Sequence, residues 1–222
     1  MKSPKANLTF VSVAASLLLA SAANGHLIIT GIGDGPLTGG TPKFVELFVA
    51  ADIADLSVYT LQNFNNGGTT ATSTFSLTGS AMGGSYLYVA TESANFTSFF
   101  GFSPTYVSSV MNVNGDDALA LNLNATLVDV YGQIGVDGTT QFWEYLDGSS
   151  VRKSQTGPSA AFVQAEWTFN GVDSLEGGVV NSSVTVPFQI GTYKPIPEPA
   201  TSAMLAAGTC LLLCRLRARR NA

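Results

Sequence analysis

Two apolar runs near the middle of the chain show the clearest pattern of hydrophobic and polar positions. They extend from Ala118 to Leu123 and from Leu127 to Tyr131, with Asn124-Ala125-Thr126 between them. Leucine occupies every second position from 119 to 123, which is the two-residue period of a strand with one buried face. The short break between the runs predicts a tight reversal, so we expect the two runs to pair as a β-hairpin.

Shorter apolar segments with the same alternation lie on both sides of this hairpin. From Lys43 to Val49, two phenylalanines fall on one face and three aliphatic residues on the other, which predicts a strand. Between Asn95 and Gly101, phenylalanines spaced by three and four residues predict one turn of helix. Further strands are predicted at Leu27 to Thr30, Asp55 to Leu61, Phe75 to Leu77, Ser85 to Ala90 and Val184 to Val186.

Turn-forming and aromatic residues flank the hairpin. Asn114-Gly115-Asp116-Asp117 precedes it, and these residues tolerate positive φ or bond nearby backbone amides. After it, Phe142-Trp143-Glu144-Tyr145 contains large aromatic side chains that a nearby core must cover. We expect Trp143 to pack against the leucines of the hairpin, within an all-β sandwich built around it.

Composition and charge agree with such a domain and exclude one class of partner. Of the 222 residues, 23 are glycine and only 11% are charged, which suits short strands joined by many turns. From Ala23 to Lys194 there are four basic and 14 acidic residues, a net charge of −10. We expect no binding of nucleic acid, because its phosphates require clustered lysine and arginine.

The first 22 residues have the organisation of a secretory signal peptide. Lys2 and Lys5 precede an apolar run from Leu8 to Ala20, and Ala20-Ser21-Ala22 supplies an A-x-A cleavage site ending at Ala22. A buried N-terminal helix is the alternative interpretation. The signal peptide predicts export, with the Sec translocon and signal peptidase as processing partners.

The C-terminal region is predicted to be a connection followed by a membrane segment. Residues 170–196 contain several glycines and end in a proline-rich spacer, for which we expect an extended conformation. Fifteen mostly apolar residues follow from Ala200 to Cys214, fewer than the roughly 20 that a membrane-spanning helix needs. A basic cluster then places the end of this short anchor helix in the cytoplasm; it consists of Arg215, Arg217, Arg219 and Arg220.

Few residues of the predicted domain suit catalysis or metal binding, and we expect no cofactor. The two cysteines, Cys210 and Cys214, lie in the anchor, and the single histidine, His26, lies at the start of the domain. Asp116 and Asp117, with Asp129 and Asp137, could supply oxygen ligands for Ca²⁺, but their spacing matches no EF-hand loop and favours turn formation.

Two glutamates next to tryptophans raise the alternative of a sugar hydrolase. Glu144 follows Trp143, and Glu166 precedes Trp167. Paired carboxylates bordered by aromatic residues are typical of glycosidases. A buried tryptophan with a solvent-facing neighbour explains both pairs more simply, so we expect no catalytic residue.

An ordered series of short blocks resembles the lamin tail domain family in its bacterial, secreted form. The blocks are LIITGIGDGP, KFVELF, DLSVYTL, TFSLTGSAMGGSYLYVA, FTSFFG, NGDDALALNLNATLVDVYGQIG, FWEY and VRKS, within residues 26–169. The resemblance implies an immunoglobulin-like β-sandwich without catalytic residues. It also implies a binding or scaffolding role, which in such proteins is sometimes attached to nucleases or other hydrolases.

Residues 197–222 resemble the PEP-CTERM sorting signal of Gram-negative bacteria that make exopolysaccharide. The similarity consists of Pro197-Glu198-Pro199, the short apolar helix and the terminal arginine cluster, in this order. It implies recognition by an exosortase, which would cut near Pro197, Glu198 and Pro199 after a transient stay in the inner membrane. An ordinary tail anchor is the alternative.

Taken together, these features predict an exported, non-enzymatic protein of the outer surface or extracellular matrix. Its expected ligand is an exopolysaccharide or a surface protein. The rival hypothesis is a secreted hydrolase, or a hydrolase accessory, that uses acidic residues with Ca²⁺ and acts on polysaccharide or nucleic acid.

Overall fold

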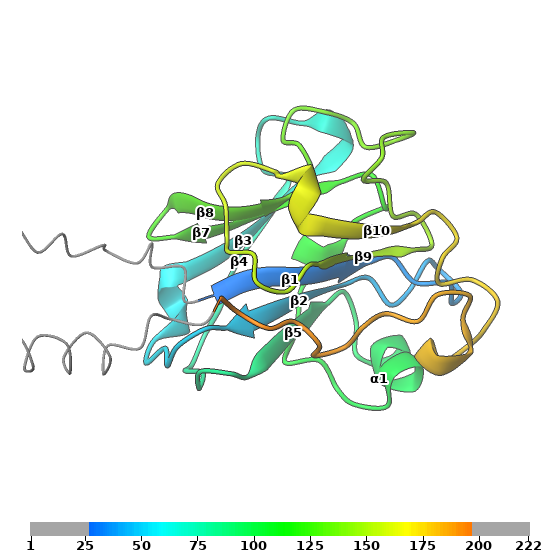
Figure 1. Ribbon diagram of the computed structural model, residues 1–222, viewed down its shortest axis with the longest axis horizontal. Coiled ribbons are helices and arrows are strands. Elements are labelled where there is room, and N and C mark those ends of the chain that lie inside the picture. The colour runs from blue at the N-terminus through cyan, green and yellow to red at the C-terminus, as the bar shows by residue number, and fades with distance from the viewer. Residues whose placement is uncertain (1–26, 197–222) are drawn as a thin grey trace, which may run out of the picture.

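Two β-sheets form the framework of the computed structural model, which describes residues 27–196 (Figure 1). The larger sheet has six strands in the order β10 (Trp167–Gly171), β9 (Ser149–Arg152), β1 (Leu27–Gly33), β2 (Phe44–Val49), β5 (Tyr86–Ala90) and β6 (Tyr106–Val107). The smaller has four, in the order β4 (Ser73–Ser76), β3 (Tyr59–Phe64), β7 (Ala118–Leu123) and β8 (Thr126–Tyr131). This arrangement confirms the expected all-β class with two sheets.

Helices are short within the described residues. The one α-helix, α1 (Ala94–Phe100), is the helical turn predicted from the phenylalanine spacing. The 3-10 turns are η1 (Leu56–Val58), η2 (Asn65–Gly67), η3 (Ser109–Met111), η4 (Gln164–Glu166) and η5 (Asn181–Ser183).

The hairpin of β7 and β8 is confirmed, with a tighter turn than the sequence indicated. Leu123 pairs with Thr126, which leaves a two-residue loop of Asn124 and Ala125. Both have positive φ, 48° and 62°, as a type I′ turn requires. This turn has the twist of the two strands, and it places the leucines of β7 toward the larger sheet.

The main core lies between the facing sides of the two sheets. Leu119 and Leu121 of β7 belong to the same buried cluster as Ile29 of β1 and Leu47 of β2. Trp143 is 1% exposed and belongs to this cluster, as predicted. The strand alternation therefore identified which side of β7 faces the main core, but the expected burial of one face only is wrong, because Ala118 and Ala120 are buried on the opposite face.

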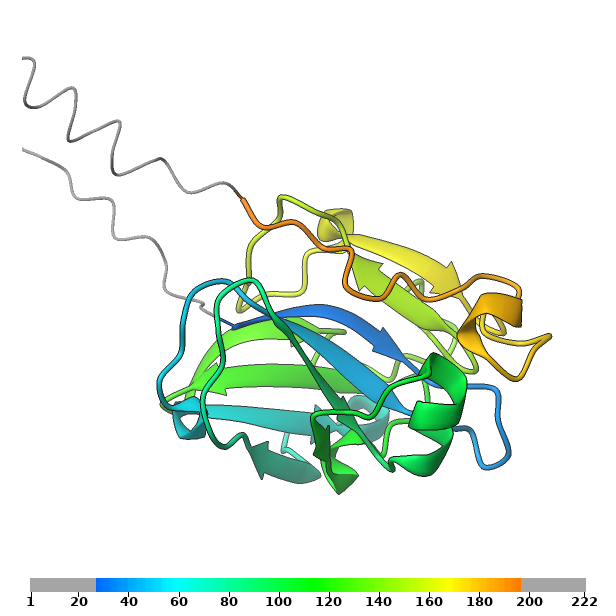
Figure 2. The ribbon, with the colours of Figure 1, turned by 90° about the horizontal axis from the view of Figure 1, so that it is seen from below.

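The outer face of the larger sheet is also covered. Phe44 and Phe48 point away from the main core, as the alternation of β2 predicted. Helix α1 and the C-terminal segment of residues 172–194 lie over this face, the segment drawn in orange tones in Figures 1 and 2. The ring of Phe44 meets Phe100 at 4.9 Å and Phe188 at 4.8 Å between centroids, both edge-on.

The C-terminal segment differs from the predicted connection, and the strand expected at Val184–Val186 is wrong. Its backbone forms bends, in which Thr185 donates to the Glu176 carbonyl and Val186 to the Ser174 carbonyl. The face of the larger sheet presents side chains rather than free backbone groups, so the backbone of this segment forms its hydrogen bonds within the segment. The Val184 side chain packs in the same buried cluster as Phe44 of β2. Folded structure therefore continues past residue 169, to Tyr193, which is 3% exposed.

Several predicted features lie outside the described residues. These are the signal peptide of residues 1–22, the Pro197-Glu198-Pro199 motif, the apolar helix of residues 200–214 and the arginines that follow it. Among residues 27–196, none of the helices has the length and apolar character needed to cross a membrane.

Candidate binding pocket

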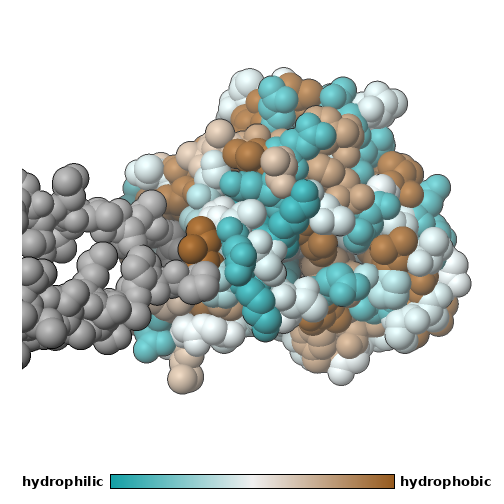
Figure 3. All heavy atoms as spheres, viewed as in Figure 1, coloured by the Kyte–Doolittle hydropathy of each residue, from teal (hydrophilic) through white to brown (hydrophobic). Residues whose placement is uncertain are grey.

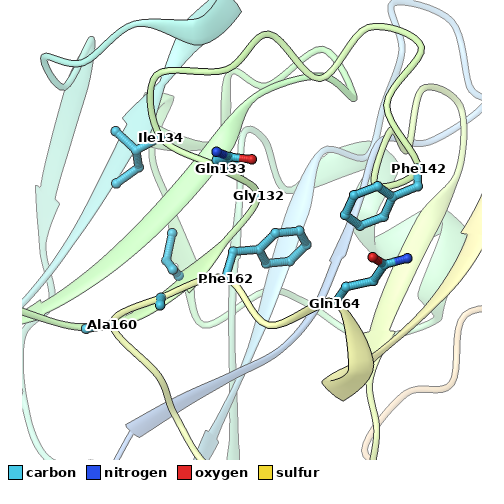
Figure 4. Close-up of a pocket in the computed structure, with 9 residues that line it drawn as sticks. Gly132, Gln133, Ile134, Phe142, Ala160, Phe162 and Gln164 are labelled. Atoms are coloured by element: carbon cyan, nitrogen blue, oxygen red, sulfur yellow. The ribbon is translucent and has the colours of Figure 1, made fainter.

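A pocket of about 500 Å³ lies where the end of β8 meets two loops (Figure 4). This volume is in the range of roughly 300 to 1,000 Å³ that is typical of small-ligand sites. We call it the β8 pocket; its lining residues are Val130, Gly132, Gln133, Ile134, Phe142, Ala160, Ala161, Phe162 and Gln164.

Two parallel phenylalanine rings form the aromatic part of the β8 pocket. The planes of Phe142 and Phe162 are 7° apart, with 6.1 Å between the centroids. Phe162 is held by the core, since it contacts Tyr131 at 5.4 Å and Trp143 at 6.2 Å. Phe142 remains 50% exposed and rests edge-on against Phe169 at 5.4 Å. The Phe142 ring is thus supported by two aromatic neighbours and remains partly open to solvent.

Two glycines let the chain pass close to the Trp143 side chain beneath the pocket. Gly132 has a φ of 77°, and a Cβ there would lie 3.0 Å from the Trp143 ring. A Cβ on Gly138 would lie 2.5 Å from the same ring and 2.5 Å from the Asp116 carbonyl. Since any larger residue would displace the tryptophan, the glycines determine where the loop bearing Phe142 returns to the core.

A buried ion-pair network holds the opposite wall. Arg152 donates to Asp129 at 2.6 Å, to Glu166 at 2.8 Å and to the Gly157 carbonyl at 2.8 Å. Asp129 also accepts from the Ser159 amide at 3.0 Å. The network therefore joins β8 to β9 and fixes the chain immediately before Ala160 and Phe162.

Burial raises the pKa of Asp129 to about 6, against the opposing attraction of the Arg152 guanidinium. Asp129 also accepts from the Ile29 amide at 2.8 Å and from its own neighbour Val130 at 3.0 Å. The carboxylate pairs with Arg152, and both of its oxygens are occupied by structural partners. Its role in this arrangement is to position the pocket wall.

The polar groups of the β8 pocket are two neutral amides. Gln133 and Gln164 are exposed, and their carboxamides form no hydrogen bond with any residue in the described range. Figure 4 shows the carboxamide of Gln164 next to the Phe142 ring, and that of Gln133 on a separate segment of the pocket lining. None of the nine lining residues is charged. The pocket can donate and accept hydrogen bonds, and it can stack a flat or apolar surface.

The two weak metal candidates have other partners. Asp117 accepts from the Asn66 amide at 2.9 Å and from the Asn114 amide at 3.0 Å, and burial raises its pKa to about 6. Asp116 accepts from the Thr139 hydroxyl at 3.2 Å. Such bonds are those expected of a turn that precedes a strand. Within residues 27–196, no group of three or more His, Cys, Asp or Glu side chains could hold a metal ion.

The glutamates next to tryptophans likewise have local partners. Glu144 accepts from the Thr140 amide at 2.7 Å, and Glu166 is bound by Arg152. Trp143 and Trp167 are both buried, so neither presents an open face on which a sugar could stack. The exposed aromatic surface comes from phenylalanines instead.

Sequence reasoning did not identify the β8 pocket. The sequence predicts that the core covers Phe142 together with Trp143, whereas the Phe142 ring is half exposed. The segment of residues 158–165 showed no strand or helix period. The only local indication of a site is an aromatic and an amide side chain two positions apart, Phe162 and Gln164, close to the predicted core residue Trp167. Which segment lies next to them in space depends on the order of strands in the sheets.

Comparison of the chain with protein-family models, with curated proteins and with solved structures found no match in any of the three.

Proposed function

We propose that this chain is an exported, non-enzymatic protein of the cell surface or extracellular matrix that binds a ligand through the β8 pocket. The observation that carries the proposal is the pocket itself. It combines a parallel ring pair, of which Phe142 is half exposed, with two unbonded carboxamides and has no charged lining residue. Acid-base or nucleophilic chemistry needs positioned ionisable groups, whereas binding needs only shape, ring faces and hydrogen-bonding groups.

The two-sheet architecture supports a scaffold role for the rest of the domain. We assign it to the immunoglobulin-like sandwich of the lamin tail type, on the residue blocks within 26–169. The packed segment of residues 172–194 extends this unit to Tyr193, where the Tyr86 hydroxyl donates to the Tyr193 carbonyl at 2.7 Å. A sandwich covered on both sides of its larger sheet is a stable frame for loops that bind ligands.

The destination follows from the terminal segments. The signal peptide with cleavage at Ala22 directs the chain through the Sec translocon, and the C-terminal arginines hold an intermediate in the inner membrane. An exosortase of a Gram-negative host then cuts near Pro197-Glu198-Pro199 and releases the domain to the outer surface or matrix.

The destination is tested by expressing the full chain in a host that has an exosortase and weighing the products by mass spectrometry. Wild type should lack the residues beyond the motif. Glu198→Ala removes the motif's only charge and should leave Arg215 to Arg220 on a membrane-bound product. Glu176→Ala, which removes an exposed carboxylate from the domain, is the matched control and should be processed normally. A wild-type product with its complete tail would contradict sorting by an exosortase.

The rival hydrolase is tested on the same purified protein. Millimolar Ca²⁺ should leave the thermal midpoint unchanged, because a ligand that binds only the native state would raise it. Incubation with polysaccharide and nucleic acid should release no fragments. A calcium-dependent rise of the midpoint together with fragment release would replace the binding function with the hydrolase.

A further inference from the structure

The size and surroundings of the β8 pocket restrict its ligand. A standard protein partner covers about 800 Å² on each side and usually meets an apolar centre. On the face in Figure 3, apolar patches are separated by hydrophilic ones and form no large continuous surface. A pocket of about 500 Å³ instead suits a small molecule or a few units of a polymer.

Charge restricts the ligand further. The domain from Ala23 to Lys194 carries a net charge of −10, so an anionic polymer would be repelled at long range. The pocket has no cationic side chain that could offset this repulsion locally, and no carboxylate that could bind a cation. Behind its wall, Asp129 and Glu166 share the single cation Arg152, so a net negative charge remains there and repels an anionic ligand further. The favoured ligand is therefore uncharged.

The unbonded groups of the pocket specify the chemistry of that ligand. The carboxamides of Gln133 and Gln164 each present donors and an acceptor, which match hydroxyl groups that both donate and accept. The exposed ring of Phe142 suits the apolar C–H face of a ring-shaped ligand. Stacked against Phe162 and supported edge-on by Phe169, this ring loses little freedom when a ligand covers it. Hydroxyl groups around an apolar ring face are the defining features of a neutral sugar.

We propose that the β8 pocket binds uncharged hexose units of a polysaccharide, with Phe142 as the stacking platform and Gln133 and Gln164 as hydroxyl-binding groups. This rests on the proposed function, since it names the ligand class of the same pocket. Recognition of this kind depends on contact rather than on long-range charge, so binding is insensitive to ionic strength.

The experiment uses native affinity electrophoresis of the full-length chain, solubilised in a non-ionic detergent that contains no sugar. Gels contain an uncharged polysaccharide (dextran, a linear β-glucan or galactomannan) or the anionic polymer alginate. Wild type should be retarded by at least one of the uncharged polymers, equally at low and high salt, and not by alginate.

Phe142→Ala removes the platform, and its half-exposed side chain makes loss of folding a minor risk. We expect it to weaken retardation about tenfold, equivalent to about 1.4 kcal/mol. Gln164→Ala should weaken it severalfold. Met82→Ala is the matched control, because Met82 is an apolar side chain that is 76% exposed and lies outside the pocket. It should bind like wild type, and circular dichroism of each variant checks the fold.

Equal retardation of wild type and a folded Phe142→Ala variant would overturn the pocket assignment. Retardation by alginate alone, or by none of the polymers, would overturn the ligand class. The proposed function has a separate failure: it falls if the chain is not exported or degrades a polysaccharide, whatever the outcome of the gels. An exported, inactive chain that ignores uncharged sugars would refute only the inference about the ligand.

Discussion

Replacing Arg152 with methionine should destabilise the domain strongly and in a pH-dependent manner. Methionine keeps the length and apolar stem of the side chain but removes every donor. The Arg152 guanidinium donates to Asp129 at 2.6 Å, to Glu166 at 2.8 Å and to the Ile29 carbonyl at 2.7 Å. It also lies 4.6 Å from the centroid of the Trp167 ring. These contacts join β8, β9, β10 and β1, so the loss affects both sheets.

The expected loss at pH 7 is about 3 to 5 kcal/mol of unfolding free energy, the usual result of removing one partner of a buried pair. The reason is that Asp129 is left buried without its counter-charge, so it either remains an unpaired buried carboxylate or takes up a proton and loses the ion pair. It keeps three backbone amide donors, from Ile29, Val130 and Ser159, so the carboxylate remains bonded and the protein folded.

Lowering the pH should relieve part of this loss. The pKa of Asp129 is raised to about 6 by burial even with Arg152 present, from an unperturbed value of 3.8, and removing the cation raises it further. Because the native state then binds the proton more tightly than the unfolded chain, stability rises as pH falls through the native pKa. Between pH 7 and pH 5, the unfolding free energy of wild type rises only below its native pKa. That of the variant, whose native pKa is higher, rises over a wider part of this interval. At about 1.4 kcal/mol per unit, the difference between the two should shrink by about 1 kcal/mol.

The assay is urea unfolding of residues 27–196 at pH 7 and pH 5 at one salt concentration, followed by circular dichroism. Lys153→Met is the matched control: Lys153 is the next residue and is exposed, and its side-chain ammonium donates only to the Ala165 carbonyl, at 2.9 Å. It should cost less than about 1 kcal/mol at either pH. A loss below about 1 kcal/mol for Arg152→Met, or a loss of equal size at both pH values, would refute the assigned role of the network.

Three further predictions concern stability. Trp143→Ala should cost about 3 to 5 kcal/mol in urea unfolding, because the side chain fills the main core, and a cost under about 1 kcal/mol would contradict its burial. Ala125→Gly should add about 0.5 to 1 kcal/mol, because relief of positive φ outweighs the greater freedom of unfolded glycine; an unchanged midpoint would argue against strain in this turn. A chain ending at Lys194 should unfold cooperatively by calorimetry, whereas one ending at Gly171 should melt lower or aggregate because the outer sheet face is uncovered; equal midpoints would show that the C-terminal segment adds no stability.

Much of the fold follows from local patterns. The alternation in β7 and β2 identified the sides that face the main core, and the phenylalanine spacing identified α1. These patterns are readable because strand and helix periods are set by backbone geometry, which is the same wherever the segment packs. Short segments outside the regular strands are less predictable: the sequence predicts a strand at Val184–Val186, where the backbone forms bends.

The candidate pocket depended on contacts between distant segments. Phe142 and Phe162 are 20 positions apart, and the bond from Arg152 to Asp129 spans 23 positions. The apolar composition of each segment is compatible with several neighbours, so one sequence does not select among them. The order of β8, β9 and β10 in the two sheets brings the two rings together.

By itself, the sequence determined the all-β class, the hairpin, the side of β7 that faces the main core and the acidic character of the domain. It also contains the terminal segments from which export and sorting are proposed. Only the tertiary structure decided that residues 172–194 cover the outer sheet face, that Phe142 stays half exposed, and that Arg152 joins the sheets. The physical reason is that the period of apolar residues specifies which side chains leave water, whereas the groups that cover them are selected by the packing of the whole chain.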